Sequence, residues 1–130
     1  MEIKVLQFRW IISKARDTYG YNICSLYVDG EKVSSCNGGG YDMAGTTLGD
    51  YLTKTYQQRL KMLYVENRFL GVNKKNYHGM FKDETTDSIY LDGGCGITQI
   101  KNIAEDIGLS IERKDWHQHI YIMSDTWHEI

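Results

Sequence analysis

The chain has 130 residues, of which 42% are hydrophobic and 25% are charged, and its net charge is −2. This length suits one domain with its own core and is too short for two ordinary domains. The charge argues against the concentrated basic face that duplex DNA binding requires, and no apolar run approaches the roughly 20 residues of a membrane-spanning helix. We therefore expect one domain over residues 1–130 that contacts small molecules or protein surfaces.

The first third of the chain is predicted to form three antiparallel strands. Residues 3–12 alternate in hydrophobicity with the period of a strand. Residues 21–28 are rich in aromatic and β-branched side chains, and residues 31–36 return after Asp29-Gly30, a strong hairpin signal. One face of the first strand is predicted to carry Leu6, Phe8, Trp10 and Ile12.

The apolar period then changes to that of a helix over residues 47–64. Thr47 with Asp50 resembles a capping box in which Asp replaces Glu, so we expect the helix to begin at Thr47. The apolar residues that repeat at this period are Leu48, Leu52, Tyr56, Leu60 and Leu63.

A polar surface loop with one short strand is expected over residues 66–88, and residues 88–91 are predicted to be a further strand. A second amphipathic helix follows over residues 97–107. Gly108 stands where a left-handed residue commonly ends a helix.

The C-terminal part is predicted to form a hairpin of residues 109–112 and 117–123, with a turn near residues 114–115. All of these strands are arranged as hairpins and not as crossover units, which indicates an antiparallel sheet. The predicted fold class is therefore α+β, in which an N-terminal meander and a C-terminal hairpin form the sheet and two helices pack on one face.

The three cysteines, Cys24, Cys36 and Cys95, are odd in number and irregularly spaced, unlike a secreted disulfide scaffold. The N-terminal residues lack the uninterrupted apolar segment of a secretory signal. Both features favour reduced thiols and a cytoplasmic location.

Two glycine-rich segments lead into the predicted helices and are the strongest candidates for a binding site. The N-terminus of a helix presents unpaired N–H groups, and glycine lets an anion approach the backbone closely. The alternative is that these glycines only make tight turns, because the chain contains no proline. The candidate phosphate-binding residues are Gly38, Gly39, Gly40, Thr46 and Thr47 at the first segment, and Gly93 and Gly94 at the second.

Aromatic and arginine side chains supply the other groups that a nucleotide site needs. Bases stack on aromatic rings, and guanidinium groups contact phosphate. The stacking candidates are Tyr41, Tyr77 and Phe81, and the cationic candidates are Arg59, Arg68 and Arg113.

Catalytic chemistry is not indicated by any motif. His117 and His119 lie two apart in a predicted strand and so point to one face, but no third metal ligand is evident. The carboxylates show no pairing typical of general acid–base catalysis. No catalytic residue, metal or cofactor is predicted, and the protein is expected to bind a partner and not to be an enzyme.

Residues 37–52 (NGGGYDMAGTTLGDYL), 90–96 (YLDGGCG) and 103–109 (IAEDIGL) resemble small accessory proteins of bacteriophages and prophages. Among these, the anti-Thoeris proteins that sequester cyclic ADP-ribose-type signals are similar in size and in α+β layout. The resemblance implies an anti-defence protein in the bacterial host cell that binds a cyclic nucleotide without cleaving it. It also implies a homo-oligomer, because small sequestering proteins commonly build their pockets between subunits.

The alternative is an anti-CRISPR-like protein that inhibits a defence nuclease by binding its surface. A thermal-shift experiment with cyclic nucleotides distinguishes the two alternatives. Only the first predicts that a small molecule alone raises the melting temperature of the protein.

Overall fold

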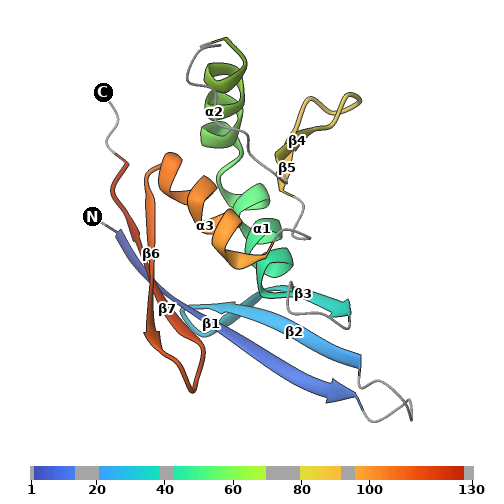
Figure 1. The fold of residues 1–130 in the computed structure, drawn as a ribbon, viewed down its shortest axis with the longest axis vertical. Coiled ribbons are helices and arrows are strands. Elements are labelled where there is room, and N and C mark those ends of the chain that lie inside the picture. Colours follow the sequence, from blue (N-terminus) through green and yellow to red (C-terminus); the bar gives the residue numbers. More distant parts are fainter. Residues whose placement is uncertain (1, 14–20, 39–42, 70–79, 92–95, 128–130) are drawn as a thin grey trace.

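The computed structural model describes residues 2–13, 21–38, 43–69, 80–91 and 96–127 (Figure 1). Five strands form one antiparallel sheet in the order β3-β2-β1-β7-β6. These strands are β1 (Glu2–Ser13), β2 (Tyr21–Val28), β3 (Glu31–Gly38), β6 (Leu109–Asp115) and β7 (Ile120–Asp125). The predicted α+β class with an antiparallel sheet is confirmed, because the N-terminal meander and the C-terminal hairpin join through β1 and β7.

The turn between β2 and β3 has the geometry that its sequence predicts. Asp29 and Gly30 both have positive φ, 50° and 86°, as a type I′ hairpin turn requires. The Asp29 carboxylate also accepts a hydrogen bond of 2.8 Å from the backbone N–H of Val5. The turn is therefore tied to the neighbouring strand as well as to its own hairpin.

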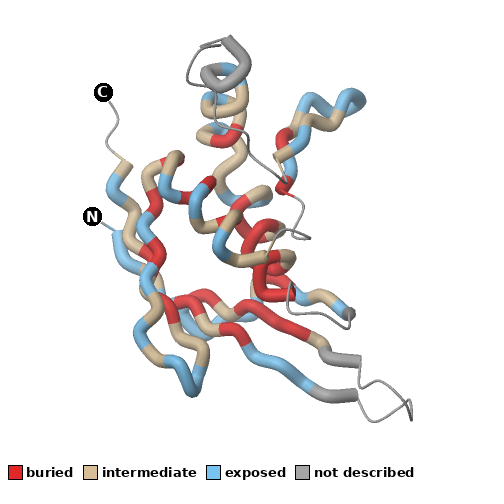
Figure 2. Tube along the Cα trace, viewed as in Figure 1, coloured by how far each residue is buried: buried red, intermediate tan, exposed pale blue. Residues whose placement is uncertain are grey.

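One face of the sheet packs against helices and the other does not (Figure 2). On β1 the side chains of Leu6 and Phe8 are buried, whereas those of Ile3 and Val5 on the opposite face are exposed. The helices α1 (Met43–Thr55) and α3 (Ile97–Asp106) contact each other, and they cover β2, β3 and β6 on the buried side. This alternation of buried and exposed residues follows from the two-residue period of a strand.

The predicted first helix is two helices, α1 and α2 (Gln57–Phe69), which meet at Tyr56. Two side chains near this junction donate hydrogen bonds to backbone carbonyls of α1. The Thr53 hydroxyl donates to Gly49 O, and the Gln57 amide donates to Thr53 O. Hydroxyls and amides that bond to the helix backbone in this way bend helices. In the described part of the chain there are therefore three helices and not two.

The start of α1 corrects the predicted capping box. The helix begins at Met43, which places Thr47 in its second turn, fully buried. The Thr47 hydroxyl donates back to the carbonyls of Met43 and Ala44, at 3.2 and 3.0 Å. Asp50 accepts hydrogen bonds from Ser34 and Lys54 instead of capping a helix start.

The helix α3 ends where the sequence predicts, since Gly108 has a φ of 87° immediately before β6. A short hairpin, β4 (Met80–Lys82) and β5 (Ile89–Leu91), forms a second sheet that projects with α2 beyond the main sheet (Figure 1). Its anchor is Gln57, whose amide donates to Ile89 O and accepts from Ile89 N–H. In the part of the chain that the model describes, no helix is long and apolar enough to cross a membrane.

Candidate ligand-binding sites

The beginnings of α1 and α3, which follow the two glycine-rich segments, lie against each other. A Cβ atom added at Gly45 would lie 2.6 Å from the carbonyl carbon of Gly96, closer than real Cβ atoms approach any atom. Only glycine at position 45 lets the two backbones come this close. The structure thus brings together the residues that flank both predicted segments.

The predicted phosphate cradle itself falls mostly outside the described residues, which do not include Gly39, Gly40, Tyr41, Gly93 or Gly94. Gly38 is the last residue of β3. Thr46 is partly buried and already engaged within the protein, and the Thr47 hydroxyl is committed to backbone carbonyls. The Thr47 hydroxyl therefore belongs to the packed interior of the helix and is not available to a phosphate.

Arg59, at the start of α2, forms a two-pronged ion pair with Asp125 at the end of β7. Its two terminal nitrogens lie 3.0 and 2.9 Å from the two carboxylate oxygens, and one of them also donates to Ile107 O. The guanidinium lies 5.0 Å from the ring centres of both Tyr56 and Trp127. Arg59 therefore braces α2 against the sheet, and a ligand phosphate would have to displace Asp125 from it.

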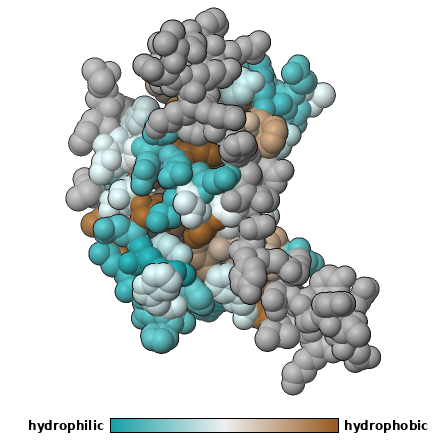
Figure 3. All heavy atoms as spheres, in the orientation of Figure 1, coloured by the Kyte–Doolittle hydropathy of each residue, from teal (hydrophilic) through white to brown (hydrophobic). Residues whose placement is uncertain are grey.

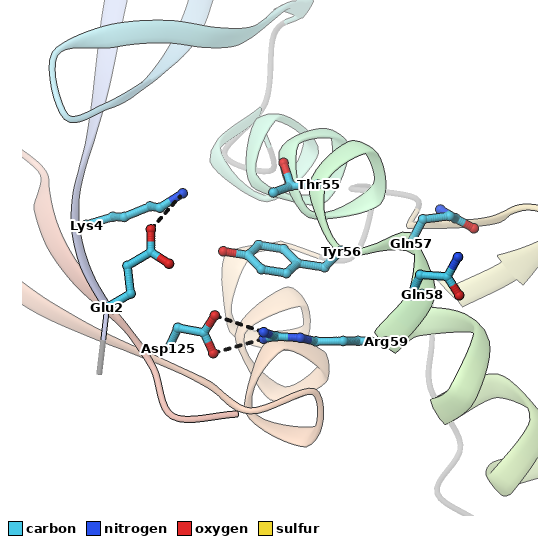
Figure 4. Close-up of a pocket in the computed structure, with 8 residues that line it drawn as sticks. All are labelled: Glu2, Lys4, Thr55, Tyr56, Gln57, Gln58, Arg59 and Asp125. Atoms are coloured by element: carbon cyan, nitrogen blue, oxygen red, sulfur yellow. Dashed lines mark hydrogen bonds and ion pairs between the residues drawn. The ribbon is translucent and has the colours of Figure 1, made fainter. Parts of the chain in front are cut away.

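A polar pocket of about 420 Å³ adjoins this brace (Figure 4). The Tyr56 hydroxyl points from the helix junction toward the strand residues of the pocket. Burial, with contributions from Tyr51 and Asp125, raises the pKa of Tyr56, so the phenol keeps its proton at neutral pH. The lining residues are Glu2, Lys4, Thr55, Tyr56, Gln57, Gln58, Arg59 and Asp125.

Arg113, on β6, also lies beside two aromatic rings but differs from Arg59 in its polar partners. Its guanidinium carbon lies 3.8 Å from the ring centre of Trp116 and 5.3 Å from that of Tyr121. The nearest acids along the strand do not pair with it: Glu112 pairs with Lys114, and the Asp115 carboxylate accepts the backbone N–H groups of the following turn. Its Nε is buried without a hydrogen-bond partner among the described residues.

The rings beside Arg113 continue along the same face of the sheet. Tyr121 contacts Phe8 edge-on, with ring centres 5.4 Å apart, and Phe8 in turn lies beside Trp10. Trp10 meets the His119 ring edge-on at 4.6 Å. His119 Nδ1 is a second buried atom without a partner in the described residues. We call Arg113, Trp116, His119 and Tyr121 the hairpin-tip cluster.

The hairpin turn corrects the predicted placement of the two histidines. The turn occupies residues 116–119, so His117 and His119 do not share a strand face. Asp115 causes this, because its carboxylate accepts the N–H groups of His117 and Gln118 at 2.8 and 3.0 Å. No group of three metal-ligating residues is present in the described ranges.

Phe81 lies away from both arginines, on the projecting β4–β5 hairpin. Its ring stacks on that of Tyr90, with ring centres 5.5 Å apart, and both side chains are exposed. Sequence reasoning missed Lys4, Tyr56, Asp125 and Trp116 as site residues. For Lys4 and Asp125 the signal would have been the pairing of β1 with β7, which no local pattern reveals.

The described cysteines are not reactive thiolates. Burial raises the pKa of Cys24 to about 11, and burial also raises the pKa of Cys36. Both thiols are free and face each other across β2 and β3. Protonated thiols at neutral pH are poor nucleophiles, so their role here is packing.

The chain matches no protein-family model, no curated protein and no solved structure. The assignment of function therefore depends on the geometry described above.

Proposed function

We propose that the protein binds a phosphorylated small molecule of the nucleotide class, with cyclic nucleotides as the first candidates, and holds it without cleaving it. The observation that carries the proposal is the hairpin-tip cluster. It offers a guanidinium that lies against two aromatic rings and that pairs with no carboxylate among the residues the structure describes. Arginine in this state retains its capacity to form paired hydrogen bonds with a phosphate.

Trp116 supplies the second half of this site. Its side chain is 73% exposed, although Arg113 lies against its ring. A base stacked on the exposed ring would lie next to the guanidinium, which is the arrangement that nucleotide-binding surfaces commonly use. On the face shown in Figure 3, the lower part of the sheet is largely hydrophilic, as a site for a charged ligand requires.

In the proposed role the protein sequesters a signalling nucleotide made by a bacterial defence system and so deprives the effector of it. We also propose that it acts as a homo-oligomer in the cytoplasm of the host cell. A second subunit would enclose a ligand that an open hairpin tip leaves half in solvent.

The test is a calorimetric titration with a panel of cyclic nucleotides on the parent protein and on Arg113→Ala and Trp116→Ala. We expect one nucleotide to bind the parent and each variant to weaken that binding by about 1.5–3 kcal/mol, as expected for a lost charge-assisted or stacking contact. Lys114→Ala is the matched control, because Lys114 is a neighbouring cation already paired with Glu112. If no nucleotide binds, or if all three variants bind like the parent, the proposal is wrong.

A second candidate function, inhibition of a defence nuclease by direct binding, has support from the same exposed residue. Tryptophan and arginine are the residues that most often dominate protein–protein interfaces. Trp116 projects from a hairpin tip, and the uncovered face of the sheet exposes Ile3, Val5 and Ile11. This alternative predicts that Trp116→Ala abolishes inhibition of the nuclease while no nucleotide in the panel changes the melting temperature.

A further inference from the structure

The pocket beside the Arg59–Asp125 brace has a composition that selects a particular class of ligand. Its volume of about 420 Å³ lies within the range of small-molecule sites. All eight of its lining residues carry polar side chains, whereas most such sites are largely apolar. Polar atoms and the carbon parts of these side chains share the wall about equally, so a ligand that fills this space must offer both polar groups and apolar surface.

The charges in the wall cancel. Arg59 and Asp125 are already paired, and Lys4 lies 3.6 Å from the Glu2 carboxylate. An anionic ligand would lie against Glu2 and Asp125, and a cationic ligand would lie against Lys4 and Arg59. Either one would leave an unbalanced charge in the site, which is unfavourable where solvent is partly excluded.

Two of the lining residues have structural roles, so their polar groups are not available to a ligand. The Gln57 amide is hydrogen-bonded to the backbone of Ile89. The terminal nitrogens of Arg59 are hydrogen-bonded to Asp125 and Ile107. The groups left to contact a ligand are the side chains of Glu2, Lys4, Thr55, Tyr56 and Gln58. Together they offer a carboxylate, an ammonium, two hydroxyls and an amide, which provide both hydrogen-bond donors and acceptors.

We propose that this pocket binds a neutral, polyhydroxylated small molecule of the saccharide class. Each sugar hydroxyl both donates and accepts, so a hydroxyl can donate to Glu2 and accept from Lys4 or Tyr56 without opening either ion pair. The apolar part of the pocket wall supplies a surface for the C–H groups of the sugar. Because the Tyr56 pKa is raised, its hydroxyl remains a donor throughout the neutral range.

This inference does not depend on the proposed nucleotide function, because the pocket shares no residue with the hairpin-tip cluster. Along β7 the two sites lie at opposite ends, at Asp125 and at Tyr121 with the preceding turn. Loss of nucleotide binding in Arg113→Ala therefore leaves saccharide binding unchanged, and each proposal fails or survives by itself.

The experiment is a titration of the intact protein with matched sugars that differ in charge alone: glucose with glucuronate and glucosamine, and galactose with galacturonate and galactosamine, followed by maltose and lactose. We expect at least one neutral sugar to bind, and its uronate and amino-sugar relatives to bind about tenfold more weakly or not at all. Absence of binding by every neutral sugar overturns the proposal, as does equal or tighter binding of the charged relatives.

Variants locate the site. Gln58→Ala and Tyr56→Phe are expected to weaken saccharide binding about five- to tenfold each, the effect of losing one hydrogen bond. Gln58 is exposed, so its replacement does not disturb the fold, and Gln118→Ala in the β6–β7 turn is the matched exposed-glutamine control. Binding that is unchanged in Gln58→Ala and Tyr56→Phe, or equally reduced in Gln118→Ala, would overturn the assignment to this pocket.

Discussion

Arg59 and Arg113 belong to the same domain, and they have different roles because their contacts differ. Arg59 makes two short contacts with the Asp125 carboxylate and a third with a backbone carbonyl. Arg113 lies against the rings of Trp116 and Tyr121 and has no carboxylate partner among the described residues. Both arginines were equal candidates for phosphate binding in the sequence, and only the tertiary contacts separate them.

The difference shows how the protein uses a partly buried positive charge. A guanidinium whose hydrogen-bonding groups are filled by the protein stabilises the fold, because removing its partner leaves an uncompensated charge. A guanidinium that only stacks on rings is held in place while its hydrogen-bonding edge remains unfilled. We therefore expect mutations at the Arg59 brace to change stability and mutations at the hairpin-tip cluster to change binding.

The largest expected effect is on stability at the brace. Asp125→Ala removes both contacts to Arg59 and an acceptor for the Trp127 N–H, and it leaves a guanidinium that is only 19% exposed. We expect the free energy of unfolding in urea to fall by about 2–4 kcal/mol. Glu112→Ala, which breaks the exposed pair with Lys114, is the control and should change it by less than about 0.5 kcal/mol. Equal losses in the two variants would contradict the distinction.

The next effect is on binding at the tip. Arg113→Lys keeps the charge but removes the planar group that lies against the rings of Trp116 and Tyr121. We expect nucleotide affinity measured by calorimetry to fall by about 1–2 kcal/mol, with the melting temperature unchanged. Full affinity in Arg113→Lys would mean that only charge matters there, and the stacking geometry would not be part of the site.

A smaller effect is expected in the acid dependence of stability. Hydrogen bonds from Arg59, opposed by partial burial and aided by the Trp127 N–H, lower the pKa of Asp125. A carboxylate whose folded pKa lies below its unfolded value, about 3.9, stabilises the fold fully above the unfolded value and loses this contribution as the pH falls through the folded pKa.

The measurement is the difference in unfolding free energy between the parent and Asp125→Asn as a function of pH. We expect this difference to be constant above about pH 5 and to shrink at lower pH. Arg113→Ala serves as the comparison, because Arg113 pairs with no carboxylate in the part of the chain that the structure describes, and its difference from the parent should not change between about pH 3 and 5. A difference at Asp125 that grows with acidification would show that the sign is wrong.

Local patterns were sufficient to predict the hairpin at Asp29-Gly30, the end of α3 at Gly108 and the alternation along β1, because each depends on nearby residues. They failed at the junction of α1 and α2, where the helix is divided at Tyr56 although its apolar period continues without a break. The brace could not be predicted, because Arg59 and Asp125 are 66 residues apart and meet only when β7 pairs with β1.

The placement of Trp116 shows the same limit on a smaller scale. The sequence predicts a turn near residues 114–115, and the structure has it at residues 116–119 because Asp115 caps the turn with its carboxylate. A shift this small moves the tryptophan from just after the predicted turn into the turn itself, at the tip of the hairpin. The candidate site depends on that shift, since it is what leaves the ring exposed beside Arg113.

The smallest expected effect completes the comparison: loss of the tip side chains should barely change stability. Trp116 is 73% exposed and so buries little apolar surface. The buried Nε of Arg113 has no hydrogen-bond partner among the described residues, which offsets what its stacking contributes. We expect Trp116→Ala and Arg113→Ala each to change the unfolding free energy by no more than about 0.5 kcal/mol. Tyr121→Ala, at a residue that is only 5% exposed in the same cluster, should lower the unfolding free energy by about 3 kcal/mol.

Urea unfolding of the three variants tests this ranking. If Arg113→Ala is as destabilising as Tyr121→Ala, Arg113 is a structural residue like Arg59, and the two arginines no longer differ in role.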